Sequence, residues 1–248
     1  MSSNNILKKI PSHIAFIMDG NGRWASSKAL DRTEGHAKGA EVAESTVRLC
    51  NDFGIKYVTL FAFSTENWKR PSDEVKFLFK TLVYYLESRS EEMISRGVRI
   101  RFIGDLSHLN DETISLASKI EKKSLHCDKL HMILAVNYGG RQEIWNAALK
   151  LADLAVKEPE KYTLLKEMDE NKFGDFLSLP DVPDPDLIVR TSGEERMSNF
   201  MLWQMAYSEL YFPKVFWPDF DKKEFEKALE VYAGRKRRFG GVDLNGQG

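Results

Sequence analysis

The stretch HIAFIMDGNGRWA, residues 13–25, joins an apolar run to an aspartate, two glycines and an arginine. The run Ile14–Met18 is typical of a buried β-strand. Asp-Gly and Asn-Gly favour a hairpin, but the residues that follow do not alternate in polarity and lead into a helix. The pattern therefore predicts a loop at the carboxyl end of a strand. Ligands of open α/β sheets bind at that edge, and glycines there let backbone N–H groups approach an anion.

Asp19 stands directly before the first glycine of this loop. Its carboxylate would repel a bare phosphate group, and a magnesium ion that bridges carboxylate and phosphate oxygens would remove the conflict. Gly20, Gly22 and Ala25 also match a dinucleotide-binding fingerprint, which expects an acidic residue at the end of the next strand. Glu41 has the right distance but falls in a predicted helix, so this match is weak. No GK[ST] sequence follows, which excludes a Walker A loop.

Two further groups of residues could bind anions. Arg32 and His36 are four residues apart and share a helical face shortly after the loop, although a solvated surface pair would show the same spacing. Arg190 ends an apolar strand-like run, and Arg196 and Ser198 follow a glycine-containing loop. A buried arginine requires an anionic partner, and two arginines fit a diphosphate. A structural salt bridge to nearby acids explains the second group equally well.

A third polar stretch, AFSTENWKRP at residues 62–71, follows the second predicted strand. Its position on the same sheet edge as Asp19 favours a functional loop, because loops at this edge carry binding sites. The alternative is a helix cap followed by a polar loop. The candidate residues of this stretch are Ser64, Glu66, Asn67, Trp68 and Arg70.

Strand-like and helical stretches alternate along the chain, which predicts an α/β fold with a central, mainly parallel β-sheet flanked by helices. We expect a single domain over residues 13–241, between a flexible N-terminal segment, 1–12, and a flexible tail, 242–248. The expected strands are Ile14–Met18, Tyr57–Phe63, Val98–Ile103, His131–Val136, Leu187–Arg190 and Leu210–Phe212, and the expected helices are Glu41–Asn51, Val75–Arg96, Glu112–Ser124 and Arg141–Lys157.

Composition narrows the classes of function. The 248 residues are 42% hydrophobic and 29% charged with a net charge of -1, which argues against a general nucleic-acid binder. The apolar stretches are too short to span a membrane, and the N-terminus has no hydrophobic signal-peptide region. Cys50 and Cys127 lack metal-ligand spacing and are expected as reduced thiols. These features predict a cytoplasmic protein.

Six motifs together resemble the cis-prenyltransferase family, and above all its bacterial undecaprenyl diphosphate synthases. They run in order through nearly the whole chain, and they are HIAFIMDGNGRWA, the Arg32/His36 pair, FAFSTENWKRP, NYGGRQEI, DLIVRTSGEERMSNFMLWQMAYSELYF and WPDF. The resemblance implies a homodimeric, magnesium-dependent transferase of isoprenoid biosynthesis. Such an enzyme adds isopentenyl diphosphate units to an allylic diphosphate, usually farnesyl diphosphate. The implied product is undecaprenyl diphosphate, the precursor of the lipid carrier for cell-wall glycans such as peptidoglycan.

The resemblance also implies roles for individual residues. Asp19 and Asn67 would be catalytic, and Asp19 and Glu209 would bind Mg²⁺. Arg238, in an RxG element, would reach the partner subunit's isopentenyl diphosphate site. The allylic diphosphate would lie on Gly20, Asn21, Gly22, Arg23, Trp24, Arg32 and His36, isopentenyl diphosphate on Arg190, Arg196 and Ser198, and the mobile loop would contain Ser64, Glu66, Trp68 and Arg70.

Further residues bear on the metal site and on the length of the product in this chain. Glu195 stands where related proteins often have a basic or neutral polar residue, which leaves the metal shell open. The apolar face of residues 75–86 is a candidate wall for a product tunnel, with ordinary core as the alternative. Long-chain members resemble this sequence in having alanine at Ala62, and strict alternation would put Phe61 and Phe63 on the opposite face. A long lipid product also favours peripheral membrane contact.

Two other classes of protein fit the sequence less well. A non-catalytic partner subunit of the same fold would lack the catalytic aspartate, whereas Asp19 is present. A nucleotide-binding oxidoreductase would need the ribose-binding acid that the sequence lacks. No Ser-His-Asp or Cys-His arrangement is evident, in agreement with a reaction that needs no protein nucleophile.

Overall fold

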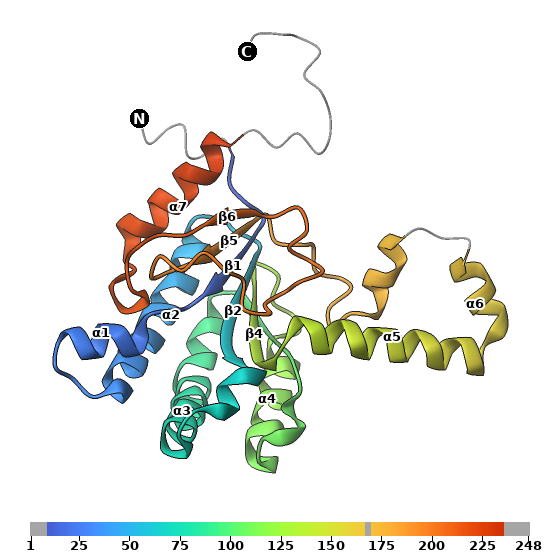
Figure 1. Cartoon of the computed structure of the whole chain (residues 1–248), viewed down its shortest axis with the longest axis horizontal. Helices are drawn as coiled ribbons and strands as arrows, with labels where there is room; N and C mark the ends of the chain where they lie inside the picture. Colours follow the sequence, from blue (N-terminus) through green and yellow to red (C-terminus); the bar gives the residue numbers. More distant parts are fainter. Residues whose placement is uncertain (1–8, 167–169, 236–248) are drawn as a thin grey trace, which may run out of the picture.

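A six-stranded, all-parallel sheet forms the centre of the molecule, with strand order β3-β4-β2-β1-β5-β6. The computed structural model describes residues 9–166 and 170–235 (Figure 1). The predicted α/β class with a parallel sheet is confirmed. The strands are β1 His13–Ile17, β2 Tyr57–Ser64, β3 Val98–Ile103, β4 Leu130–Tyr138, β5 Leu187–Arg190 and β6 Glu209–Tyr211.

The helices occupy two different positions relative to the sheet. Helices α2, α3, α4 and α7 pack with one face of the sheet, whereas α5 and α6 form an arm that projects away from the body (Figure 1). The opposite face is covered largely by irregular chain on both sides of β5, at residues 179–182 and 197–205. The helices are α1 Asn21–Ser27, α2 Arg32–Asp52, α3 Ser72–Ser95, α4 Asp111–Ser124, α5 Gly140–Lys157, α6 Pro159–Lys166 and α7 Lys222–Gly234.

Helix α7 was not expected from the sequence, although its signals are present. Asp221 caps the helix by accepting a hydrogen bond from the backbone N–H of Glu224 at 3.0 Å. Phe225, Leu229 and Tyr232 follow at helical spacing and are buried. Helix α2 likewise begins at Arg32, nine residues before the predicted start at Glu41.

The end of β2 departs from simple alternation. The pairing of β2 with β4 shifts in register between Phe61 and Phe63. Such an irregularity turns the side chains that follow it relative to the strand. Phe61 therefore stacks on Phe200 with ring centroids 4.4 Å apart, while Phe63 lies 4.7 Å from Phe79 of α3, on the other face. The expectation that Phe61 and Phe63 share a face is wrong, and Ala62 packs on the α3 side.

Both cysteines, Cys50 and Cys127, are buried and unbonded to each other. Burial raises the pKa of the Cys50 thiol, so the group stays protonated and unreactive. None of the helices in residues 9–166 and 170–235 is both long and apolar enough to cross a membrane.

Candidate active site

The loop after β1 is built around Gly20. Its φ of +107° is strained for residues with a side chain, and an added Cβ would lie 2.7 Å from Phe216. The backbone carbonyl oxygen of Asp19 accepts hydrogen bonds from Thr191 Oγ1 at 2.7 Å and from the backbone N–H of Trp217 at 3.0 Å. These contacts fix the end of β1 against the end of β5, and they place the Asp19 carboxylate at the sheet's carboxyl edge.

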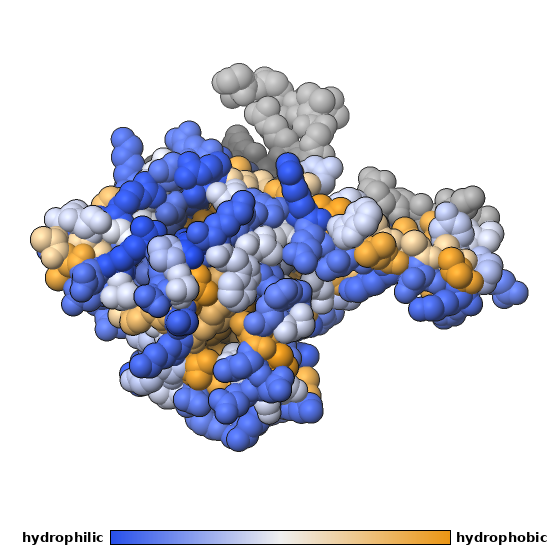
Figure 2. Space-filling view, turned by 60° about the horizontal axis from the view of Figure 1, so that its bottom comes forward, coloured by the Kyte–Doolittle hydropathy of each residue, from blue (hydrophilic) through white to orange (hydrophobic). Residues whose placement is uncertain are grey.

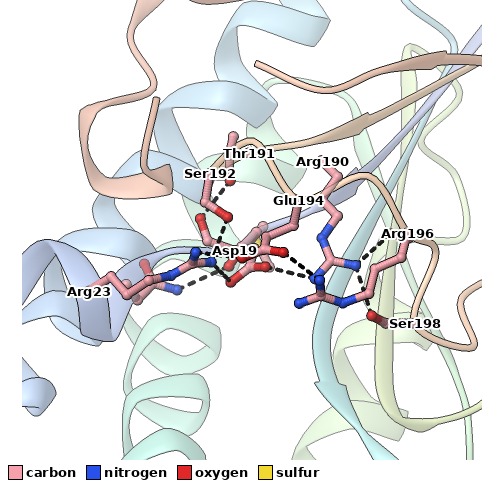
Figure 3. A network of polar contacts seen from close by, with 10 residues as sticks. Asp19, Arg23, Arg190, Thr191, Ser192, Glu194, Arg196 and Ser198 are labelled. Carbon is pink, nitrogen blue, oxygen red and sulfur yellow. Dashed lines mark hydrogen bonds and ion pairs between the residues drawn. The ribbon is translucent and has the colours of Figure 1, made fainter. Parts of the chain in front are cut away.

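Asp19 lies between two arginines (Figure 3). Its two carboxylate oxygens accept from Arg190 Nη2 at 2.7 Å and from Arg23 Nη2 at 3.1 Å. Burial by itself would raise the pKa of Asp19, but the hydrogen bonds and charges of Arg190 and Arg23 outweigh it, and the pKa lies below its ordinary value. The carboxylate is therefore ionised at neutral pH.

Arg190 is 4% exposed and ends β5 as predicted. Its Nη1 donates to Ser198 Oγ at 2.7 Å and to the backbone carbonyl oxygen of Arg196. Asp19 supplies the compensating charge, so the anionic partner required for a buried arginine is a residue of the site itself. The predicted structural salt bridge and the predicted functional cluster are thus the same arrangement.

Glu194 is a member of this cluster that sequence reasoning missed. It accepts from Arg23 Nη1 at 2.7 Å and also pairs with Arg196, while Arg23 donates to Ser192 Oγ at 2.7 Å (Figure 3). The hydrogen bond from Arg196, followed by that from Arg23, holds the pKa of the Glu194 carboxyl below its usual value. The Glu194 carboxylate thus lies between Arg23 and Arg196 and compensates part of their charge.

A second cationic cluster surrounds Glu74, which was also missed. This side chain is 8% exposed and accepts from Arg32 Nε at 3.0 Å, Arg70 Nη1 at 2.9 Å and His36 Nε2 at 3.1 Å. The three basic residues come from α2 and from the loop after β2, so the fold brings together two of the predicted groups. Burial lowers the pKa of His36, an effect that the Glu74 carboxylate partly offsets.

The 3-10 helix Thr65–Lys69 after β2 is held at two points, by the end of β4 and by the loop after β5. Trp68 Nε1 donates to Asn137 Oδ1 at 2.8 Å, and Asn199 Nδ2 donates to Glu66 Oε1 at 3.0 Å. Asn137 and Asn199 lie inside two of the quoted motifs but were not chosen as site residues, because the sequence does not show which side chains they contact.

Asn67, predicted as a catalytic residue, makes a local contact. Its Oδ1 accepts from the backbone N–H of Ser64 at 3.0 Å, and together the two residues form a capping box. The side chain thereby holds the entry to the loop while still bordering the cavity described below.

One cavity of about 470 Å³ joins the two clusters to the apolar interior. It continues past Ala62 between α2, α3 and the sheet, where Leu78 and Leu82 line it, while Val75 belongs to the ordinary core. Figure 2 shows apolar side chains within a hollow bordered by hydrophilic ones. The predicted site residues that border the cavity are Asp19, Gly20, Asn21, Gly22, Arg23, Arg32, His36, Ser64, Asn67, Arg70, Arg190, Arg196 and Ser198.

Other predicted residues lie elsewhere. Trp24 is buried away from the cavity, and its indole N–H donates to Asp219 at 2.7 Å. Glu209 is the first residue of β6 and pairs with Leu187 of β5, which precedes Arg190 by three residues. The Glu209 side chain forms an ion pair with Arg235 at 3.0 Å. Three residues correspond to about 10 Å along the strands, so Glu209 and Asp19 of the same chain do not lie together. Arg238 is outside the described residues, and Glu195 is exposed.

The donor set of the site fits a magnesium ion. Mg²⁺ usually binds through one or two carboxylates together with substrate phosphate oxygens, and the ionised Asp19 borders the cavity beside groups that suit phosphate. The described residues hold no group of three or more His, Cys, Asp or Glu side chains placed to bind a metal. Asp19 is the protein ligand that this geometry supports.

Two clusters of basic side chains border one cavity with an apolar interior, an arrangement that suits a diphosphate ester of a hydrophobic molecule. Comparison with known proteins agrees. Residues 17–240 match a family model described as "Putative undecaprenyl diphosphate synthase". An isoprenyl transferase of Aquifex aeolicus is 48% identical over 94% of this chain and 97% of its own.

Two further relatives are similar over almost the whole chain. A ditrans,polycis-undecaprenyl-diphosphate synthase ((2E,6E)-farnesyl-diphosphate specific) of Micrococcus luteus is 43% identical over 98% of this chain and 96% of its own. The crystal structure of lavandulyl diphosphate synthase from Lavandula x intermedia in complex with dimethylallyl diphosphate has a TM-score of 0.88 and 34% identity. The match covers 93% of this chain and 98% of the lavandulyl diphosphate synthase chain. The chain therefore belongs to the undecaprenyl diphosphate synthase family, and it is a prenyltransferase.

Proposed function

We propose that this prenyltransferase condenses isopentenyl diphosphate with an allylic diphosphate, farnesyl diphosphate, and forms a cis double bond in each cycle. The observation that carries the proposal is the pair of cationic clusters at the mouth of one apolar cavity. Two diphosphates bring several negative charges into one site, and arginines compensate them. A relative of known structure binds dimethylallyl diphosphate, itself an allylic diphosphate.

In the proposed reaction the allylic carbon–oxygen bond breaks while the isopentenyl double bond attacks the same carbon, and a proton then leaves. Negative charge develops on the departing diphosphate, where the arginines of the site stabilise it. Arg32, His36 and Arg70 hold the allylic diphosphate, and Arg190, Arg196 and Ser198 hold isopentenyl diphosphate. When bound at Asp19, Mg²⁺ adds charge stabilisation on the leaving diphosphate oxygens.

Asp19 keeps Arg190 and Arg23 in place before the substrates bind. Glu74 and Glu194 pair with the arginines of the two cationic clusters, so a diphosphate that binds there would take over contacts that these carboxylates make. The side chain of Asn67 is a poor base, and the proton leaves to a diphosphate oxygen or to water.

The apolar part of the cavity accommodates the growing chain. Ala62 lines it where β2 ends, and the small side chain leaves the passage past Leu78 and Leu82 open. We propose undecaprenyl diphosphate as the product, supported by the name of the Micrococcus luteus relative. The enzyme would then act in the cytoplasm on the route to the lipid carrier for cell-wall glycans, with peripheral membrane contact for product release.

The arm formed by α5 supports the proposed homodimer. Trp145, Leu149 and Val156 are 63%, 50% and 80% exposed and recur at helical spacing on this helix. Figure 2 shows apolar side chains gathered on the projecting arm. A stripe of this kind is typical of a surface that packs on a second copy.

The test uses the purified chain alone. It is incubated with farnesyl diphosphate, radiolabelled isopentenyl diphosphate and Mg²⁺, and the products are extracted into organic solvent. We expect label in the organic phase, and we expect none when Mg²⁺ is replaced by a chelator. A folded chain that transfers no label on its own would contradict the proposal and would favour a non-catalytic subunit.

A further inference from the structure

Three distant segments of the chain meet at Asn199. Its side-chain Nδ2 donates to Glu66 Oε1 at 3.0 Å, in the 3-10 helix after β2. Its Oδ1 accepts from the backbone N–H of Arg141 at 2.8 Å, and its carbonyl oxygen accepts from the backbone N–H of Gly140 at 2.7 Å. One residue therefore uses a donor and two acceptors to join the loop after β5, the loop after β2 and the start of α5.

The contact to α5 is a helix cap supplied from outside the helix. The N-cap residue, Gly139, has no side chain, so the first N–H groups of α5 need other acceptors. Asn199 provides two of them. A Cβ added at Gly139 would lie 2.7 Å from Asn199 Nδ2 and 2.9 Å from Thr65 Oγ1. The glycine thus lets both loops lie against the same point of the backbone.

The backbone around Asn199 directs neighbouring side chains to different partners. Ser198 and Asn199 have φ values of +47° and +64°, which is uncommon for residues other than glycine. In this conformation Ser198 Oγ accepts from Arg190 at 2.7 Å while the Asn199 amide reaches Glu66. Glu66 and Arg190 are therefore connected through the side chains of two adjacent residues, Asn199 and Ser198.

We propose that Asn199 is a positioning residue that links the loop after β2, through Glu66, to the anion-binding loop after β5. The inference rests on the proposed function, in which these two loops bind the two diphosphates, and adds that they are coupled. The hydrogen bond from Asn199 to Glu66 is charge-assisted, because Glu66 is a carboxylate, and such bonds are stronger than those between neutral groups. Asn199 touches neither substrate in this scheme.

A variant pair separates the link from the helix cap. Asn199→Asp keeps the size of the side chain and an acceptor for Arg141, and its charge is favourable at the start of α5. It replaces the donor to Glu66 with a second carboxylate, and we expect thermal stability close to that of the parent because the favourable charge at the start of α5 offsets the new repulsion. We also expect an about tenfold or larger rise in KM for isopentenyl diphosphate or loss of kcat. Combining it with Glu66→Gln reverses donor and acceptor and should recover most of that loss.

The controls decide between a coupled link and a structural effect. Asn110 caps α4 by accepting from Thr113 N–H at 2.9 Å, away from the cavity, so Asn110→Ala should lower stability and leave KM unchanged. The proposal is overturned if Asn199→Asp has the kinetics of the parent, or if the effects of Asn199→Asp and Glu66→Gln merely multiply.

A second readout keeps the inference separate from the proposed function. If the parent transfers no label to farnesyl diphosphate, the proposed function fails and the same variants are compared by calorimetric binding of inorganic diphosphate. Coupling predicts that Asn199→Asp weakens this binding and that Glu66→Gln restores it in the double variant. Equal dissociation constants for parent and Asn199→Asp would overturn the link.

Discussion

Replacing Asp19 with alanine removes the carboxylate that lies between Arg190 and Arg23. We expect the variant to fold and to lose nearly all turnover. The reason is that Mg²⁺ loses its protein ligand and the charge that develops on the leaving diphosphate is less stabilised. Loss of a group that stabilises charge in a transition state lowers turnover by roughly a hundredfold to a thousandfold. The arginines remain, so the variant should still bind inorganic diphosphate.

The stability cost follows from the burial of Arg190. Removing one partner of a buried ion pair costs about 3–5 kcal/mol, because the other charge is left uncompensated. Here Asp19 is 26% exposed, and Arg190 keeps its hydrogen bond to Ser198, so the cost should be smaller, about 2 kcal/mol. For a chain of this length that corresponds to a fall in Tm of roughly 4–8 °C.

The assay measures label transfer from isopentenyl diphosphate, with Tm as the test of folding. Asp181→Ala is the matched control, because Asp181 accepts two hydrogen bonds of 2.7 Å from Arg101, away from the cavity. This control should lose stability without losing turnover. A folded Asp19→Ala protein with near-normal turnover would refute the role given to Asp19.

Three other predictions concern separate parts of the chain. Deleting residues 238–248 should raise KM for isopentenyl diphosphate and lower kcat; unchanged kinetics would make this segment a solvated tail. Ala62→Leu should shorten the product, which chromatography after dephosphorylation would detect, and overpacking should cost about 1–3 kcal/mol of stability. A folded variant with the parent's product lengths would show that Ala62 does not limit the passage. Burial, opposed by a hydrogen bond to Pro183, lowers the pKa of His13 to about 4. The unfolded chain therefore takes up the proton first, and acidification from pH 6.5 to 4 should cost up to about 3 kcal/mol of unfolding free energy. Denaturant titrations across that range that show no such loss, relative to His13→Gln, would contradict it.

The central strands were predictable because they are apolar runs with flanking turn residues, as burial on both faces of a parallel sheet requires, and the edge strand Val98–Ile103 was predictable from its alternation of apolar residues with Arg99 and Arg101. Val98–Ile103 and Leu187–Arg190 have the bounds that the sequence indicated. The start of α2 was missed, because its first turns carry Arg32 and His36 instead of apolar residues. In the folded chain both side chains pair with Glu74, which is 38 residues from His36.

Those parts of the site were predictable whose residues are close together in the sequence. Asp19 beside glycines and Arg190 at a strand end are unusual enough to indicate anion binding from residue type and position alone. The grouping of Arg32 and His36 with Arg70 required the fold, since parallel strands bring their following loops to one edge. The same holds for Asn199, whose partners lie 58 and 133 residues away in the sequence.

The sequence by itself determined the class of fold, the edge of the sheet that carries the site and most of the cationic groups that border the cavity. Each of these follows from a local pattern of polarity or from an ordered set of motifs. The tertiary structure decided which carboxylate faces which cation. It also decided that Trp24 and Glu209 point elsewhere and that Ala62 lies with Phe63. These outcomes depend on register, on bulges and on contacts between distant segments, which local patterns do not specify.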